Sequence, residues 1–117
     1  MMSGLSSALS GLQAVQTKVE NNANNIANLN TDGFNKSRVL LTEKSPQGVQ
    51  AEVEEVDTPG YYQLERTGDG QEMIEKSNVD LGEEIPEMIV NKKSYGANLK
   101  TIETIDQMTG QLLDTQA

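Results

Sequence analysis

Residues 3–29 read SGLSSALSGLQAVQTKVENNANNIANL, and apolar side chains recur in this stretch at alternating spacings of three and four. They form a heptad seam of eight positions, seven of them apolar: Leu5, Ala8, Leu12, Val15, Val19, Asn22, Ile26 and Leu29. The spacing predicts one long helix with an apolar stripe. A single amphipathic helix lying on a core and one helix of a coiled coil give much the same stripe, so both arrangements stay open.

Asn22 is the polar exception in the seam. A buried Asn at such a position commonly fixes register and partner number at a cost in stability, and the alternative is a solvated Asn at the edge of the stripe. The segment around it is rich in asparagine, which weakens an isolated helix but suits one whose flanks hydrogen-bond to neighbouring chains. The six residues are Asn21, Asn22, Asn24, Asn25, Asn28 and Asn30. Turn residues follow at 30–34, where Gly33 suits a positive φ and ends the helix.

A second helix is predicted from about Asp80 to Thr115. Its apolar stripe comprises Met88, Ile89, Tyr95, Leu99, Ile102, Ile105, Met108, Leu112 and Leu113. Asp80 and Glu83 have the spacing of a capping box. Pro86 conflicts with that start because it removes a helical hydrogen bond in the second turn, so the helix either begins near Ile85 or kinks at Pro86.

Three glycines in this second helix, Gly82, Gly96 and Gly110, are fourteen residues apart. On a helix with a seven-residue repeat they share one face, where another helix backbone could approach closely. Chance spacing explains them equally well.

The segment between the helices has the alternation of β-strands. Apolar residues alternate on either side of a turn at 46–48, namely at Val39, Leu41, Val49, Ala51, Val53 and Val56. Residues 58–60 form another turn, Tyr61, Tyr62 and Leu64 start a third extended piece, and residues 68–70 are a flexible loop. We expect a small antiparallel β element or an irregular arm that packs against another part of the structure, because a lone two-stranded ribbon is only marginally stable in water.

The predicted fold class is therefore mainly α. The long N- and C-terminal helices pair in a coiled-coil-like hairpin, and a small β or irregular element sits at its closed end. The chain divides into an N-terminal helix and signature at 1–34, a β-rich or irregular middle at 35–79 and a C-terminal helix at 80–117.

The composition predicts a poor core for 117 residues. Apolar residues make up 35% of the chain and aromatic residues 3%, against roughly 45–50% apolar in average globular domains. We expect a monomer that is incompletely stable and that gains order from a partner. An ordinary small domain packed with Leu, Ile, Val and Met is the alternative.

Charge and residue usage exclude several function classes. The net charge is −9, with three basic and ten acidic side chains between residues 41 and 80, which argues against binding to nucleic acid or to an anionic membrane. The chain has no Cys and no His, which removes thiol chemistry, the usual zinc sites and imidazole bases. We therefore predict no enzyme, no catalytic residues, no cofactor and no metal. No apolar run is long enough for a membrane span, and the start does not read as a secretory signal peptide.

Both ends of the sequence resemble one known family. Residues 23–34, ANNIANLNTDGF, with SALSGL at 7–12, closely resemble the N-terminal signature of flagellar rod, hook and hook-associated proteins. Residues 77–81, SNVDL, resemble its C-terminal signature, together with Glu83, Glu84, Met88, Ile89, Tyr95, Asn98, Thr104 and Met108. Between them, GVQA at 48–51 and VDTP at 56–59 are similar to the middle of the small proximal-rod protein of that family.

The resemblance implies a structural subunit of the bacterial flagellar basal-body rod. It implies export without a cleaved signal peptide by the flagellar type III export apparatus, and helical assembly with itself and other rod and basal-body proteins in the periplasm. The paired terminal helices would then transmit torque and line the export channel. Candidate residues of the assembly interface are Leu5, Leu12, Val15, Val19, Asn22, Ile26, Leu29, Asn25, Asn28, Phe34, Met88, Tyr95, Leu99, Ile102, Ile105 and Leu112. The alternative is a helical adaptor or assembly factor that does not polymerise.

Overall fold

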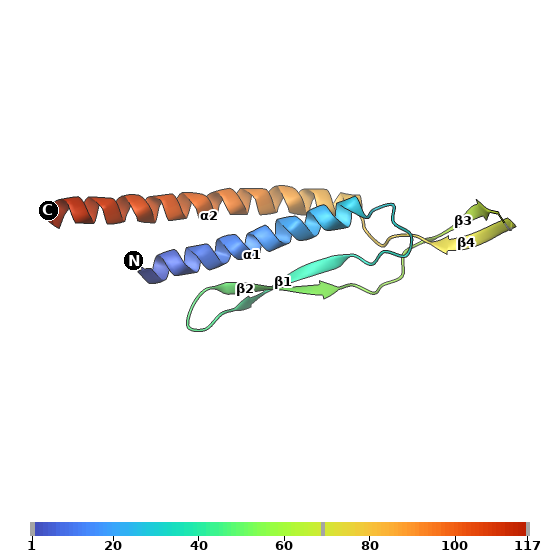
Figure 1. Ribbon diagram of the computed structural model, residues 1–117, viewed down its shortest axis with the longest axis horizontal. Helices are drawn as coiled ribbons and strands as arrows, with labels where there is room; N and C mark the ends of the chain where they lie inside the picture. Colours follow the sequence, from blue (N-terminus) through green and yellow to red (C-terminus); the bar gives the residue numbers. More distant parts are fainter. Residues whose placement is uncertain (1, 69, 117) are drawn as a thin grey trace.

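The computed structural model describes residues 2–68 and 70–116, which form two helices and four strands. In chain order these are α1 (Met2–Ala27), β1 (Ser37–Glu43), β2 (Val49–Glu55), β3 (Tyr62–Thr67), β4 (Gly70–Glu75) and α2 (Leu81–Gln116). The molecule is a rod with extents of 80 × 24 × 20 Å. Figure 1 shows the two helices running antiparallel along most of its length, with both chain termini at the same end.

The helices pack side by side but differ in length. At roughly 1.5 Å per residue, α1 spans about 39 Å and α2 about 54 Å. A Cβ added to Gly11 of α1 would lie 3.4 Å from Asn98 Oδ1 of α2, and one added to Gly4 would lie 3.9 Å from Ile105 Cδ1. Gly4 is close to the start of α1, so the last three turns of α2 extend past it, as Figure 1 shows.

The N-terminus of α2 is capped by Asp80, whose Oδ1 accepts a hydrogen bond of 3.0 Å from the Gly82 amide. The helix therefore begins at Leu81, and Pro86 lies inside it. The alternative of a start near Ile85 is wrong, because the Asp80 cap satisfies the first turn well before the proline. At the same closed end of the helical pair, α1 stops at Ala27 and a turn leads to Gly33, whose φ of 70° confirms the predicted positive φ.

The first hairpin folds back along α1. β1 and β2 pair antiparallel, with Val39 opposite Val53 and Leu41 opposite Ala51. The start of β2 is fastened to the helix by a 3.1 Å hydrogen bond from the Val49 amide to Ser10 Oγ. Gly48 has a φ of 107°, and a Cβ there would lie 2.5 Å from Ser10 Oγ, so the approach requires glycine.

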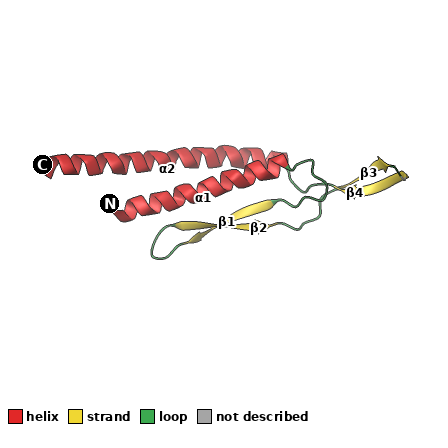
Figure 2. Ribbon diagram, in the orientation of Figure 1, coloured by secondary structure: helices red, strands yellow, loops and turns green. Residues whose placement is uncertain are grey.

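The second hairpin points away from the helices. β3 and β4 pair antiparallel, with Tyr62 opposite Glu75 and Leu64 opposite Met73. Among the described residues, neither strand packs on a helix or on a strand of the first hairpin, and Figure 2 shows the second hairpin projecting from the closed end of the helical pair. Asp69, in the predicted loop at 68–70, lies outside the described residues, and Gly70 begins β4.

The predicted mainly α class is wrong. The chain is α+β: beside helices of 26 and 36 residues, it has four strands in two separate antiparallel hairpins. The sequence pattern predicted three extended segments and missed β4, because β4 (GQEMIE) is polar and has only Met73 and Ile74 as apolar residues. The middle also does not sit wholly at the closed end, since β1–β2 covers α1. The placement of long helices at the two ends agrees with the structure.

The apolar core is small. Among the described residues, only four apolar side chains are buried: Ala8, Ala14, Val15 and Val79. The large apolar side chains that remain exposed include Leu40, Leu41, Val53, Tyr62, Leu64, Met73, Ile85, Ile89, Val90, Leu99, Met108, Leu112 and Leu113. Within the described residues, neither helix carries a stretch that is long and apolar enough to cross a bilayer. Much apolar surface is therefore left for contacts outside this chain.

Gly60 marks a close crossing of two backbones at the base of the second hairpin. A Cβ at this position would lie 1.9 Å from the Lys76 carbonyl oxygen, so the backbone has to move to admit any side chain. We expect Gly60→Ala to lower the free energy of unfolding by about 1–3 kcal/mol, measured by urea unfolding followed by circular dichroism. Gly68→Ala is the control, because no atom lies within 4 Å of its added Cβ. Equal effects of the two substitutions would contradict the crossing.

Candidate functional site

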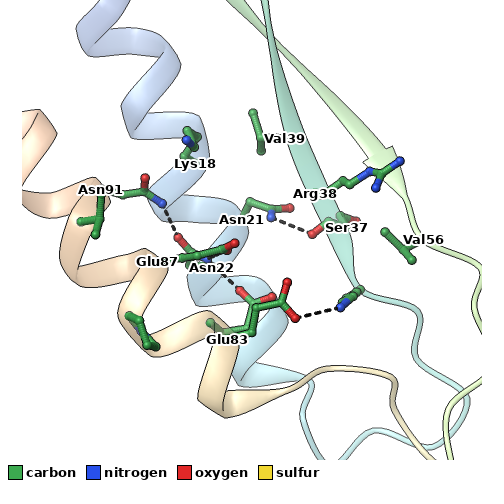
Figure 3. A pocket seen from close by; sticks show the side chains of 14 residues that line it. Lys18, Asn21, Asn22, Ser37, Arg38, Val39, Val56, Glu83, Glu87 and Asn91 are labelled. Carbon is green, nitrogen blue, oxygen red and sulfur yellow. Dashed lines mark hydrogen bonds and ion pairs between the residues drawn. The ribbon is translucent and has the colours of Figure 1, made fainter.

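A cluster of polar side chains, rather than leucines, fills the interface where the two helices meet at the closed end. Asn22 and Asn25 of α1 are 1% and 0% exposed, and Glu84 and Asn91 of α2 are 4% and 5% exposed. We call these four residues the polar seam. They face one another across the helix pair, and Figure 3 shows Asn22 between Asn91 and the carboxylates at the start of α2.

The hydrogen bonds of the polar seam form one connected network. Asn22 Nδ2 donates to Glu84 Oε2 at 2.7 Å, and Asn25 Nδ2 donates to Glu84 Oε1 at 3.1 Å. Asn91 Nδ2 donates to Asn22 Oδ1 at 2.6 Å. Asn22 is therefore not a solvated residue at the edge of the stripe. The network also explains why this Asn occupies a seam position, because its amide satisfies both an acceptor and a donor on α2.

Glu84 gives the polar seam its register. Burying a carboxylate is costly unless charge-assisted hydrogen bonds compensate it, and here two amides supply them. Sliding α2 by one turn along α1 would move Glu84 away from both amides and leave a buried charge without donors. We infer that the network selects one alignment of the helices. Glu83, Glu84 and Glu87 complement the helix dipole, as expected from the sequence, but that explanation is incomplete for Glu84.

The same part of α1 holds the start of the first hairpin. Asn25 accepts a hydrogen bond from the Ser37 amide at 3.1 Å and donates one to the Ser37 carbonyl at 2.8 Å. Asn21 donates to the same carbonyl at 2.8 Å. The Asn25 side chain thus pairs with β1 as a strand neighbour would, while its amide also reaches Glu84. One residue joins three elements: α1, α2 and β1.

Asn78 performs a comparable role between the hairpins and α2. Its Oδ1 accepts from the Lys36 amide at 2.6 Å, and its Nδ2 donates to the Val56 and Thr58 carbonyls, both at 2.9 Å. Its own amide donates to the Phe34 carbonyl at 3.2 Å. These bonds connect the segments before β1, after β2 and before α2. The junction of the fold therefore depends on an amide side chain instead of an apolar cluster.

Lys76 ties the second hairpin to the turn after α1. Its Nζ lies 2.8 Å from Asp32 Oδ1 and also pairs with Glu65 of β3. The hydrogen bond to Asp32, followed by the one to Glu65, raises the pKa of Lys76 above its usual value. Two further hydrogen bonds hold the base of the hairpin, from the Gly33 amide to the Glu75 carbonyl and from the Gly60 amide to the Glu75 carboxylate.

The raised pKa of Lys76 gives a testable pH dependence. A group with a raised pKa in the folded state contributes stability at every pH below its unfolded pKa, roughly 10.4 for Lys, and loses that contribution above it. We expect Lys76→Met to be less stable than the wild type at pH 8, and the difference to shrink as the pH passes 10.4. Urea unfolding at pH 8 and at pH 11 measures it, with the exposed Lys93→Met as control. A difference that grows with pH would contradict this role.

A groove of about 480 Å³ opens beside the polar seam, between α1, α2 and β1. Lys18, Lys36 and Arg38 contribute positive charge to its walls, and Glu83, Glu84 and Glu87 contribute negative charge. Lys36 Nζ and Glu83 Oε2 are 3.5 Å apart across it. Among the described residues, no group of three or more His, Cys, Asp or Glu side chains is arranged to hold a metal ion. The groove presents hydrogen-bonding and charged groups of both signs.

Most of the predicted interface residues are buried or half-buried within the chain. Val15, Asn22 and Asn25 are buried. Half-buried positions are Leu5, Leu12, Val19, Ile26, Leu29, Asn28, Phe34, Met88, Tyr95, Ile102 and Ile105, whereas Leu99 and Leu112 are exposed. Their contact with neighbouring chains stays a prediction. Asn28 bonds locally to Asn24 and Thr31 and closes the end of α1.

Sequence reasoning missed three residues of the site: Glu84 and Asn91 of the polar seam, and Asn78 of the junction. A signal for the first two was present, because Glu84, Asn91 and Asn98 are seven residues apart and so share one helix face. The fourteen-residue glycine repeat does not mark a contact within the chain. No atom lies within 4 Å of a Cβ added at Gly96 or Gly110.

Comparison with known proteins matches both ends of the chain. A family model described as "Flagella basal body rod protein" matches residues 5–35, and one described as "Flagellar basal body rod FlgEFG protein C-terminal" matches residues 71–115. The flagellar hook protein FlgE of Borreliella burgdorferi is 39% identical over 70 residues, covering 60% of this chain and 16% of the relative. The flagellar basal-body rod protein FlgG of Bacillus subtilis is 45% identical over 49 residues, covering 42% and 19%.

The chain spans less than a fifth of the length of these curated relatives. The nearer resemblance to the small proximal-rod protein, FlgC, stays a prediction. The two matched segments contain the polar seam, the Gly33 turn and Asn78, which are the features that hold the two ends of the fold together. Two rod-protein models matching in order at the two ends place the chain in the family of flagellar rod and hook proteins.

Proposed function

We propose that this chain is a structural subunit of the bacterial flagellar basal-body rod. It assembles helically with copies of itself and with other axial proteins, transmits torque and lines the export channel. It has no catalytic role, in keeping with a family of structural parts. Its place is the periplasmic part of the basal body, which it reaches through the flagellar type III export apparatus without a cleaved signal peptide.

The single observation that carries the proposal is that far more large apolar side chains are exposed than are buried. Four apolar side chains are buried, whereas sixteen large ones stay exposed in the described residues. A monomer that worked alone would leave this surface in water, at about 25 cal/mol per Å² of apolar area. Packing between subunits removes that surface from water. The polar seam keeps the two helices aligned, so that each subunit presents the same faces to its neighbours.

Deletion and complementation in the bacterium that makes the chain test the proposal. A strain without the chain is expected to be non-motile and to lack hooks and filaments in electron micrographs, because distal axial parts need a completed rod beneath them. Wild-type protein supplied in trans should restore both. A deletion strain that still builds complete flagella would refute the proposal. Restored assembly by a chain absent from the purified particle would favour the adaptor.

A further inference from the structure

Two elements at opposite ends of the rod expose apolar side chains that no other described element covers. At one end, α2 is exposed from Asp106 to Thr115. This segment extends beyond Gly4, which is near the start of α1 and lies opposite Ile105. At the other end, the β3–β4 hairpin projects with no layer against either face. Hairpins of two strands need a helix or further strands to be stable in water. Both elements are therefore incomplete within one chain.

The exposed end of α2 is apolar. Met108, Leu112 and Leu113 are 53%, 51% and 65% exposed. They continue the helix whose preceding turn packs on α1 through Ile105, beside Gly4, so their surface is continuous with an interface already formed inside the chain. We call residues 106–115 the α2 overhang.

One face of the β3–β4 hairpin matches it. Side chains directly opposite in an antiparallel pair share a face, so Tyr62, Leu64 and Met73 lie together. They are 57%, 53% and 62% exposed. The other face carries Glu65 opposite Glu72; Glu65 is paired with Lys76, and Glu72 is exposed. Glu75, opposite Tyr62, lies on the same face as Tyr62, and its carboxylate accepts a 3.3 Å hydrogen bond from the Gly60 amide. The hairpin thus has three exposed apolar side chains on one face and two carboxylates on the other.

Charge distinguishes the two faces in the same sense. Arg66 alternates with Leu64 and Tyr62 and so lies on the apolar face, and it forms no ion pair with the described residues. The α2 overhang carries Asp106 and Asp114 and has no basic residue in its last turn. Its helix C-terminus adds partial negative charge. The overhang is therefore complementary in charge to the Arg66 end of the apolar face, whose Glu75, at the opposite end, is engaged by the Gly60 amide. On the other face it would meet the exposed carboxylate of Glu72.

We propose that the α2 overhang of one copy of this chain packs on the Tyr62, Leu64 and Met73 face of the β3–β4 hairpin of the next copy. The two elements stand at opposite ends of an 80 Å molecule, as Figure 1 shows, so one chain cannot join them to each other. A contact between unlike patches repeats head to tail and builds an open assembly. The chain already covers its first hairpin in this way, with α1 lying on β1–β2. The contact deepens the proposed rod function and rests on it.

Cross-linking single-cysteine variants tests the contact, because the chain has no cysteine of its own. Leu112→Cys and Met73→Cys chains are mixed and treated with a short thiol-reactive cross-linker. We expect roughly tenfold more dimer in the mixture than in either variant alone, because the contact raises the effective concentration of one thiol at the other. Leu112→Cys mixed with Glu72→Cys is the matched control, since Glu72 lies on the opposite face of the same strand. Adding Arg66→Glu to the Met73→Cys chain should lower the yield several-fold.

Two results would overturn the contact. The first is a Leu112→Cys sample that cross-links alone as well as the mixture, which indicates a two-fold contact between overhangs. The second is a mixture that yields no more dimer than the Glu72→Cys control. Failure here is distinct from failure of the proposed function: a chain present in basal bodies but without this cross-link loses only the contact. A cross-linked chain that is absent from basal bodies keeps the contact and loses the function.

Discussion

Asn25→Ala is expected to lower the free energy of unfolding by about 3–4 kcal/mol. The substitution removes the hydrogen bonds to both backbone groups of Ser37 and one of the amide donors to Glu84. A typical hydrogen bond contributes about 1 kcal/mol, and weakening the partners of a buried charge costs several kcal/mol. Urea unfolding followed by far-ultraviolet circular dichroism measures the change.

Asn24→Ala is the matched control for this substitution, because Asn24 is exposed and its side chain bonds only to its neighbour Asn28. We expect a change of about 0.5 kcal/mol or less there. If Asn25→Ala and Asn24→Ala had the same effect, the polar seam would not hold the helices together. The control is well matched because both residues belong to the same helix turn and to the same sequence signature.

Asn78→Ala is expected to cost about 3 kcal/mol, since three side-chain hydrogen bonds are lost at roughly 1 kcal/mol each. The effect is local to the junction, so amide hydrogen exchange should quicken at Lys36, whose amide loses its acceptor, while protection in the middle of α1 is kept. Asn35→Ala is the control, because Asn35 is joined to Glu55 by one exposed hydrogen bond. Unchanged exchange at Lys36 would contradict the role of Asn78.

The features predicted from sequence are those that depend on local pattern. The heptad stripe gave the long helix α1, the alternation around Val39 and Val53 gave the first hairpin, and the position of Gly33 gave a positive φ. Each follows from residues within a few positions of one another. The asparagine-rich end of α1 also indicated hydrogen-bonding flanks, although their partners within the chain were not foreseen.

Features that depend on distant residues were missed. Glu84 lies in a helix N-terminus, where the dipole explains any acidic residue, and its actual partners Asn22 and Asn25 are 62 and 59 positions away. Gly60 requires glycine because the Lys76 carbonyl crosses it. Nothing in the residues adjacent to either position reveals these contacts, because they arise only when the two ends of the chain fold together.

The fold class was wrong for a related reason. β3 and β4 carry few apolar residues, and their apolar face is not covered within the chain, so the usual alternation of a half-buried strand is weak. If another subunit covers this face, as we propose, the pattern of β3 and β4 has its explanation in the assembly rather than in the single chain. The same reasoning applies to the α2 overhang, where Leu112 and Leu113 continue the apolar stripe of α2 beyond the end of its contact with α1.

The central claim is that this chain is a built-in part of the flagellar rod, and mass spectrometry of purified intact hook–basal bodies tests it most directly. We predict that peptides of this chain are present in several copies per particle and survive the washes that remove loosely bound proteins. Absence from intact particles, with the chain still present in the cell, would contradict the account and indicate an adaptor or assembly factor instead.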